Sequence, residues 1–206
     1  MTMPIDTQFD FLKETPSGKD ADAVSPTLKR YHRLLWTKPL PSGPVFDLKD
    51  RAGAYLVHEA KERTIYPASD AITTNLHGKA AGVLAQIPPE RRPPDRGYTI
   101  GSSLLFPGEK VGRQMTINGA RGFHPRIADR FDLMLECIRR HYDAKESPLS
   151  EVLERYGYFF ELFVDFDGYV QFWLLQDLLD AAGEIRFFHP LTASAVRRSH
   201  GRLGTT

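Results

Sequence analysis

Apolar residues recur at the three- and four-residue spacing of an amphipathic helix in three stretches of the chain. The clearest covers residues 125–142, where an acid in the first turn and bases in the last complement the helix dipole. Its apolar stripe consists of Ile127, Phe131, Met134, Leu135, Ile138 and Tyr142. The other two stretches, 25–36 and 147–160, begin with a capping serine followed by a proline at the first helical position. We predict helices over all three, with Gly157 as a break or kink in the last.

Shorter apolar runs bounded by Pro, Gly or charged residues are typical of strands. They predict strands at 45–48, 54–58, 64–66, 98–106, 114–117 and 184–188. A brief helix capped by Ser69 or Asp70 is expected to extend to Asn75. Residues 162–179 are dense in aromatic and leucine side chains, and Gly168 leaves either a hairpin or a buried helix open. The spacing of the apolar residues favours the helix.

Together these elements predict an α+β protein with a small mixed or antiparallel sheet packed against about four helices. With 206 residues, the chain fits one domain that buries most of its apolar surface without a disulfide or a metal. We expect a single domain over 1–206. It would include an irregular N-terminal segment (1–24), a Pro- and Arg-rich loop (77–97) and a basic tail (190–206).

The composition narrows the classes of function. A hydrophobic share of 41% argues against disorder, and a net charge of +1 provides no general attraction for nucleic acid or anionic membranes. The single cysteine, Cys137, excludes an internal disulfide and a multi-thiolate zinc site, and the seven histidines show no metal-ligand spacing. The sequence shows no signal peptide and no apolar run of membrane length. We therefore expect a cytoplasmic protein with no metal, no cofactor and no membrane partner.

The segment 116–125, TINGARGFHP, carries the most suggestive polar pattern. It is predicted to be a loop that leads from a strand into the 125–142 helix, where unpaired N-terminal amides favour an anion. Gly119 and Gly122 would let the backbone approach a ligand, which Asn118 and Arg121 would bind. Arg130 would extend the basic rim. The alternative is a structural connection in which Arg121 pairs with an internal acid. The pattern matches neither a P-loop nor a dinucleotide fingerprint, so both interpretations stay open.

Two functions follow from these interpretations. The first is binding or processing of a phosphorylated ligand, a nucleotide or a nucleic-acid end at the 116–125 loop, with Asp129 or His32 as the proton-transfer group if the protein is an enzyme. The second is a non-catalytic interaction or oligomerisation module that uses the aromatic C-terminal third, which would allow a homo-oligomer. The surroundings of the Arg121 side chain distinguish these two functions. A site requires this side chain to face an open cleft without an acidic partner, whereas a structural role predicts a buried ion pair.

Three segments together resemble a widespread bacterial family, a domain of unknown function. They are residues 25–41 (SPTLKRYHRLLWTKPLP), 116–122 (TINGARG) and 129–139 (DRFDLMLECIR). The resemblance covers nearly the whole chain and implies one intact domain. It implies no activity, cofactor or catalytic residue.

Overall fold

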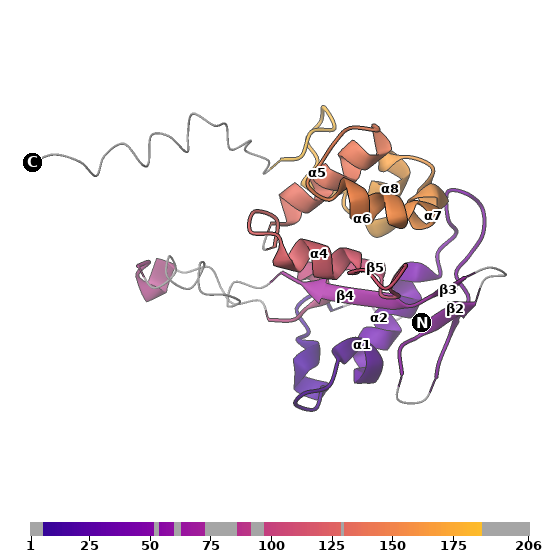
Figure 1. Cartoon of the computed structure of the whole chain (residues 1–206). Coiled ribbons are helices and arrows are strands. Elements are labelled where there is room, and N and C mark those ends of the chain that lie inside the picture. Colours follow the sequence, from indigo (N-terminus) through magenta and orange to yellow (C-terminus); the bar gives the residue numbers. More distant parts are fainter. Residues whose placement is uncertain are drawn as a thin grey trace, which may run out of the picture.

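A two-stranded antiparallel sheet lies between two groups of helices (Figure 1). The computed structural model describes residues 6–51, 54–59, 63–72, 86–91, 97–128 and 130–186. The sheet consists of β4 (Pro67–Ala71) and β5 (Ser103–Pro107), which pair along their whole length from Pro67↔Pro107 to Ala71↔Ser103. All five residues of β5 are buried, so this strand forms the floor on which the helices pack.

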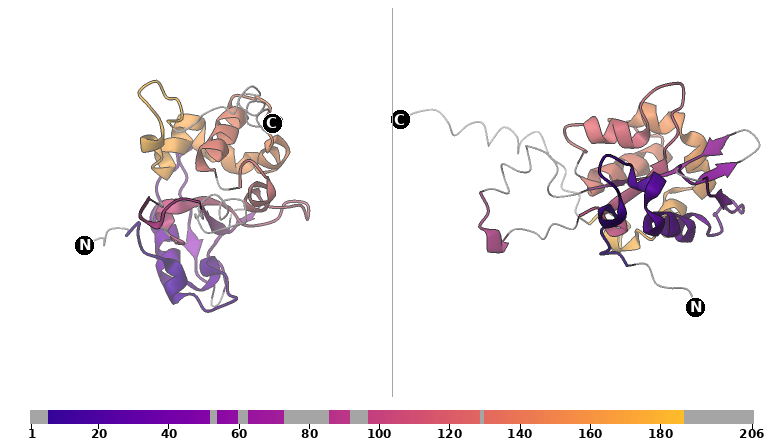
Figure 2. Two further views of the ribbon diagram at one scale, coloured as in Figure 1. Left: turned by 90° about the vertical axis from the view of Figure 1, so that its left-hand side faces the viewer. Right: turned by 90° about the horizontal axis from the view of Figure 1, so that it is seen from below.

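The helices divide between the two sides of this sheet, as the left view of Figure 2 also shows. One side carries α1 (Ala21–Val24) and α2 (Pro26–Trp36). The other carries α4 (Ile117–Phe123), α5 (Phe131–Tyr142), α6 (Ser150–Arg155), α7 (Gly157–Phe160) and α8 (Phe166–Trp173). Short 3-10 helices lie at Phe11–Glu14, Pro89–Arg91, Ile100–Ser102, Glu161–Phe163 and Gln176–Leu178.

A second antiparallel sheet has the order β1-β2-β3. It consists of β1 (Leu48–Lys49), β2 (Val57–Glu59) and β3 (Thr64–Ile65). The predicted strand at 64–66 is therefore confirmed as the hairpin partner of the preceding strand. The α+β class is also confirmed. The described residues differ from the prediction in having two small sheets in place of one. They also form seven α-helices, two of them of a single turn (α1 and α7), in place of about four.

α2 forms as the sequence predicts. The Ser25 hydroxyl oxygen accepts a hydrogen bond from the Leu28 amide at 3.0 Å, and Pro26 occupies the first helical position. Leu28, Tyr31 and Trp36 are buried on its inner face. Trp36 then contacts the rings of Phe46, Phe159 and Trp173, which join the N-terminal and C-terminal parts of the core.

The α5 helix confirms the clearest prediction but begins six residues later than expected, at Phe131. Residues 125–128 form turns, in which the Ile127 and Ala128 amides donate to the His124 carbonyl. Ile127 is nevertheless buried, at 3% exposure. The apolar periodicity of α5 thus extends back through the preceding turns, and for this reason the helix was predicted to start too early.

The C-terminal third folds as consecutive short helices. α6 and α7 meet at Tyr156, next to the predicted break at Gly157. The segment left open between hairpin and helix contains α8, because Asp165 caps it by accepting the Gly168 amide at 2.8 Å. Six aromatic side chains of this region pack on one another in the core: Phe159, Phe160, Phe163, Tyr169, Phe172 and Trp173.

Three other local predictions were wrong. Residues 69–71 continue β4 instead of starting a helix, because pairing with β5 outweighs the capping tendency of Ser69 and Asp70. Residues 114–117 form no strand; they lead into α4. Of the predicted strand 184–188, only Ile185 forms an isolated bridge, to Leu179, and residues 187–188 lie outside the described part.

Candidate functional site

The predicted anion-binding loop is a helix, and this corrects the local geometry on which that site was built. The Thr116 hydroxyl oxygen caps α4 by accepting the Gly119 amide at 3.1 Å. Two glycines disfavour a helix by roughly 1 kcal/mol each, but Ile117 anchors the segment with a fully buried side chain. At Gly122 an added Cβ would meet no atom within 4 Å. No close approach of another group to the backbone therefore requires glycine at this position.

Arg121 lies on the inner side of α4 and is 2% exposed. Its Nη2 donates to the Asp70 carboxylate on β4, and its Nη1 donates to the Ala128 carbonyl. This is the buried ion pair that the structural interpretation predicts. The guanidinium therefore joins α4 to the sheet instead of facing an open cleft.

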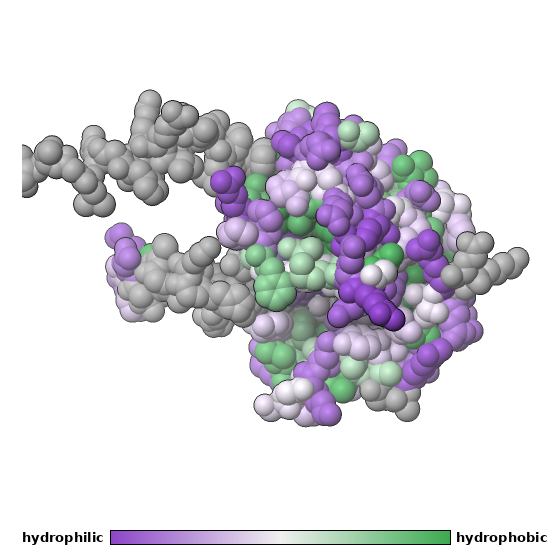
Figure 3. All heavy atoms as spheres, in the orientation of Figure 1, coloured by the Kyte–Doolittle hydropathy of each residue, from purple (hydrophilic) through white to green (hydrophobic). Residues whose placement is uncertain are grey.

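A cavity of about 550 Å³ lies between α1, β4 and α4. We call it the acidic cavity. Four carboxylates line it, and none of its twelve lining residues is Lys, Arg or His. These residues are Asp20, Asp22, Tyr55, Tyr66, Ala68, Ser69, Asp70, Gly108, Glu109, Thr116, Asn118 and Gly119. In the surface view, a recess lies between the pale surface over α4 and the surface over α1 (Figure 3).

Asp22 is the most tightly held of the four carboxylates, at 5% exposure. Its Oδ1 lies 2.7 Å from His32 Nε2 and accepts the Ser69 hydroxyl at 2.8 Å, while its Oδ2 accepts the Ser69 amide at 2.8 Å. Asp22 thereby joins α1, α2 and the outer edge of β4. The neighbouring Asp20 caps α1 and accepts the Tyr55 hydroxyl at 2.5 Å. Burial, followed by this bond to Asp20, raises the pKa of Tyr55, which keeps it a donor.

Glu109 closes the opposite wall of the acidic cavity. Its carboxylate accepts the Tyr66 amide at 3.0 Å and the Tyr158 hydroxyl at 2.5 Å. Burial, followed by the bond to Glu109, raises the pKa of Tyr158 above its usual range. A carboxylate offers about four lone-pair sites. Each of the four carboxylates of the acidic cavity can therefore accept further hydrogen bonds from a ligand.

Asn118 contributes an unusual acceptor to this wall. Its Oδ1 is buried and has no hydrogen-bond partner among the described residues. A buried polar atom without a partner costs about 1–3 kcal/mol relative to a satisfied one. A hydrogen-bond donor brought by a ligand would remove that cost if the Asn118 side chain turned towards the cavity.

The structure brings together only part of the predicted site. Asn118 and Gly119 line the acidic cavity. Arg121 does not line it, but it forms an ion pair with Asp70, which does. His32 also stands behind the wall, through Asp22, and at 1% exposure it does not reach the cavity.

The remaining predicted residues lie elsewhere. Gly122 faces outward on α4. Arg130 forms a bidentate pair with Asp132, two residues along the chain, and its pKa is raised chiefly by that bond. Asp129 lies outside the described residues, as do most of the loop 77–97 and the whole tail 190–206.

Sequence reasoning missed the carboxylates Asp20, Asp22, Asp70 and Glu109. The only signal for Asp20 was its capping position before a short helix, and nothing local marked Glu109. Their convergence depends on the pairing of β4 with β5, which brings residues near 20, 70, 109 and 118 to one place.

Within the described ranges, no three His, Cys, Asp or Glu side chains are grouped so as to hold a metal ion. The same ranges contain no helix with the length and apolarity that crossing a membrane requires.

The chain belongs to a family of unknown function (DUF6994), whose model matches residues 5–200. The resemblance seen in the sequence is thereby confirmed as a domain of unknown function. No curated protein and no solved structure matches the chain.

Proposed function

We propose that the protein binds a small molecule bearing an ammonium or guanidinium group in the acidic cavity. The observation that carries this proposal is the charge of the lining: Asp20, Asp22, Asp70 and Glu109 face one space whose described lining includes no basic side chain. Opposite charges within a few ångströms attract by several kcal/mol at the effective dielectric constant of a protein surface, about 20.

The hydrogen-bonding capacity of the wall supports the same class of ligand. The unpaired Asn118 Oδ1 is an acceptor, and the carboxylates are acceptors as well. Ammonium and guanidinium groups carry three and five N–H donors respectively and accept none. Donors of the wall, such as Tyr55 and Ser69, already point at Asp20 and Asp22, and this arrangement holds the acids in place before a ligand arrives.

The lining disfavours the phosphorylated ligand suggested by the sequence. A phosphate would approach four carboxylates, while Arg121 is already engaged with Asp70 and Ala128. The interaction-module alternative has less support, because most aromatic side chains of α7 and α8 are buried within the chain itself. Only Tyr158 and Phe166 among them are half-buried. A cytoplasmic location remains part of our proposal and rests on the sequence alone.

The test is a thermal-shift and calorimetric comparison of cations and anions at low salt. We expect 1,4-diaminobutane, agmatine or arginine to stabilise the protein, and phosphate or AMP to have no effect. The affinity for the cation should fall as salt rises, since part of the cavity is open to solvent.

Two substitutions test whether the cation binds in the acidic cavity. Asp20→Asn keeps the capping oxygen but removes a charge, and Asn118→Ala removes the unpaired acceptor; each should weaken cation binding at least fivefold. Gly122→Ala is the matched control on α4, because an added Cβ there meets no atom within 4 Å. Stabilisation by phosphate alone, or equal cation binding by all three variants, would overturn the proposal.

A further inference from the structure

A second cavity, of about 270 Å³, lies beside the partner strand of the same sheet. We call it the β5 cavity. β4 contributes Ser69 and Asp70 to the acidic cavity, and the β5 residues that pair with them, Leu105 and Leu104, line the β5 cavity. Its remaining walls come from α2, α5, α8 and the segments around residues 7 and 101. The two cavities share no lining residue, so their ligands can be studied separately.

The lining of the β5 cavity is mostly aliphatic and aromatic, and none of its described residues is acidic or basic. Its volume exceeds that of the 150 Å³ cavity known to hold benzene, and lies just below the range of about 300–1,000 Å³ typical of drug-sized ligands. A single ring with a short substituent matches this size.

Two polar groups in this apolar lining have no partner. The Tyr169 side chain is 2% exposed, and its hydroxyl makes no hydrogen bond with another described residue. Trp173 is 7% exposed, and its Nε1 is buried and likewise unpartnered. Buried phenol and indole groups normally have hydrogen-bond partners, because an unsatisfied donor forfeits its bond to water.

From these observations we infer that the β5 cavity binds a small, neutral, largely apolar molecule with one carbonyl-type acceptor, which pairs with the Tyr169 hydroxyl. Burial raises the pKa of Tyr169, so its hydroxyl stays protonated and can donate. A carboxylate ligand would be desolvated without a basic group in the described lining, and this favours a neutral acceptor.

The rim of the cavity supports access by a ligand. Leu174 lines it and is 62% exposed, with a left-handed backbone (φ 60°) at the end of α8. This conformation ends α8, because a left-handed residue is a common helix C-cap. An exposed leucine at the mouth also presents apolar surface to an entering ring.

The test uses two probes of nearly the same shape, acetophenone and α-methylstyrene, which differ by C=O against C=CH₂. Binding is followed by tryptophan fluorescence and by chemical-shift changes on the full chain. We expect acetophenone to bind at least fivefold more tightly, because only its carbonyl can accept a hydrogen bond. If neither probe binds at millimolar concentration, or both bind equally, the inference is wrong.

Variants of the full chain then assign the preference to the cavity. Tyr169→Phe removes only the unpartnered hydroxyl and should reduce the preference for acetophenone, while Leu35→Trp should fill the space and abolish binding of both probes. Tyr142→Phe is the matched control, because that hydroxyl donates to the Phe160 carbonyl and lies outside the β5 cavity. An unchanged preference in Tyr169→Phe would overturn the inference.

Discussion

Arg121 on α4 and Asp70 on β4 form an ion pair in which the guanidinium is buried and the carboxylate faces the acidic cavity. The side-chain exposures are 3% for Arg121 and 35% for Asp70. The pair therefore has two roles: it fastens α4 onto the sheet, and it fixes one wall of the cavity.

The first prediction concerns this pair. Arg121→Met preserves much of the side-chain volume but removes the guanidinium that donates to Asp70 and to the Ala128 carbonyl. We expect the free energy of unfolding to fall by about 2 kcal/mol, measured by urea denaturation. Arg126→Met, an exposed arginine just beyond α4, is the control and should change stability by less than about 0.5 kcal/mol. Equal stability of both variants would show that Arg121 is not structural.

The second prediction concerns the contact of Asp22 with His32 and Ser69. Asp22→Ala removes the acceptor that joins α1, α2 and β4, and should lower the free energy of unfolding by about 2–3 kcal/mol. Ser69→Ala should cost about 1 kcal/mol. Because the two residues share hydrogen bonds, the double variant should lose less than the sum of the single losses. Strict additivity in a double-mutant cycle would contradict the network.

The elements that the sequence predicted well are those with a local cause. α2, α5 and α8 have capping residues or an apolar periodicity that can be seen within a dozen residues. α4 was not predicted, because Gly119 and Gly122 disfavour a helix. Its stability comes from the burial of Ile117 and from the ion pair of Arg121 with Asp70, 51 positions away in the sequence. β4 was not predicted for the same reason, because its partner strand, β5, is distant in the sequence.

The candidate site was less predictable than the fold. Asn118 and Gly119 were predicted to bind an anion, and they do line the acidic cavity, yet the charge around them is negative. The sign of that charge comes from Asp20, Asp22, Asp70 and Glu109, which no sequence spacing connects. Spacing along the chain identified a segment, but only tertiary packing determines the chemistry it faces.

The third prediction separates two glycines near the C-terminal helices. At Gly168 an added Cβ would lie 2.1 Å from the Phe163 carbonyl oxygen, a backbone atom that cannot easily move. Gly168→Ala should therefore destabilise the protein by at least about 2 kcal/mol, although alanine favours helices. Gly157→Ala, where nothing lies within 4 Å, should be neutral or stabilising by up to about 1 kcal/mol. Chemical denaturation of the two variants decides; similar losses in both would contradict this packing.

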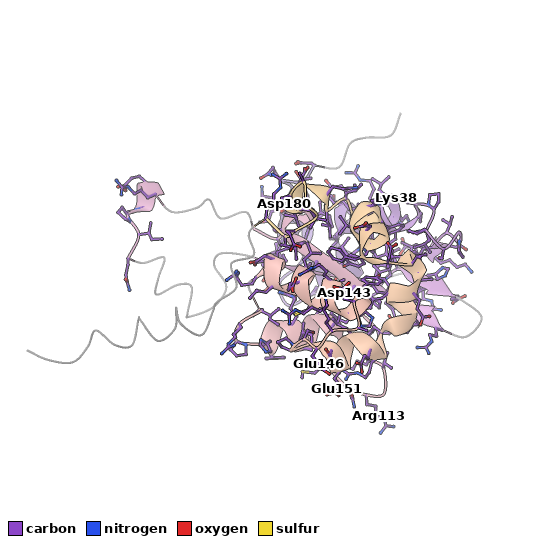
Figure 4. All side chains as sticks on the ribbon, turned by 90° about the horizontal axis from the view of Figure 1, so that it is seen from above. Lys38, Arg113, Asp143, Glu146, Glu151 and Asp180 are labelled. Atoms are coloured by element: carbon purple, nitrogen blue, oxygen red, sulfur yellow. The ribbon has the colours of Figure 1, made fainter. Side chains whose placement is uncertain are left out.

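The fourth prediction concerns Lys38, which lies beside α8 (Figure 4). Its ammonium donates to the Phe172 carbonyl and lies 4.5 Å from the centre of the Phe172 ring. Burial lowers the pKa of Lys38 to about 8 from its ordinary 10.5. Between these two values the unfolded chain binds more protons, so this group makes stability rise with pH. Lys38→Met should remove that component, and an unchanged difference between wild type and variant from pH 7.5 to 10 would contradict it.

The last prediction concerns the alkaline limit of stability, through Tyr142. Burial, followed by the charges of Tyr169 and Asp165, raises the pKa of Tyr142, whose hydroxyl donates to the Phe160 carbonyl at 2.8 Å. In the unfolded chain this phenol ionises near pH 10. Its contribution is therefore complete below pH 10 and is lost as the pH rises towards the folded value.

Tyr142→Phe isolates that contribution. At pH 8 the variant should be less stable than wild type by about 1 kcal/mol, the value of the lost hydrogen bond. By pH 11 the wild-type advantage should have fallen by about 1.4 kcal/mol, because only the unfolded wild-type chain gains from ionising this phenol. Urea denaturation at pH 8, 9, 10 and 11 measures the difference. A gap between the two proteins that stays constant with pH would mean that Tyr142 ionises equally well in the folded state, and hence that its hydroxyl is not held at Phe160.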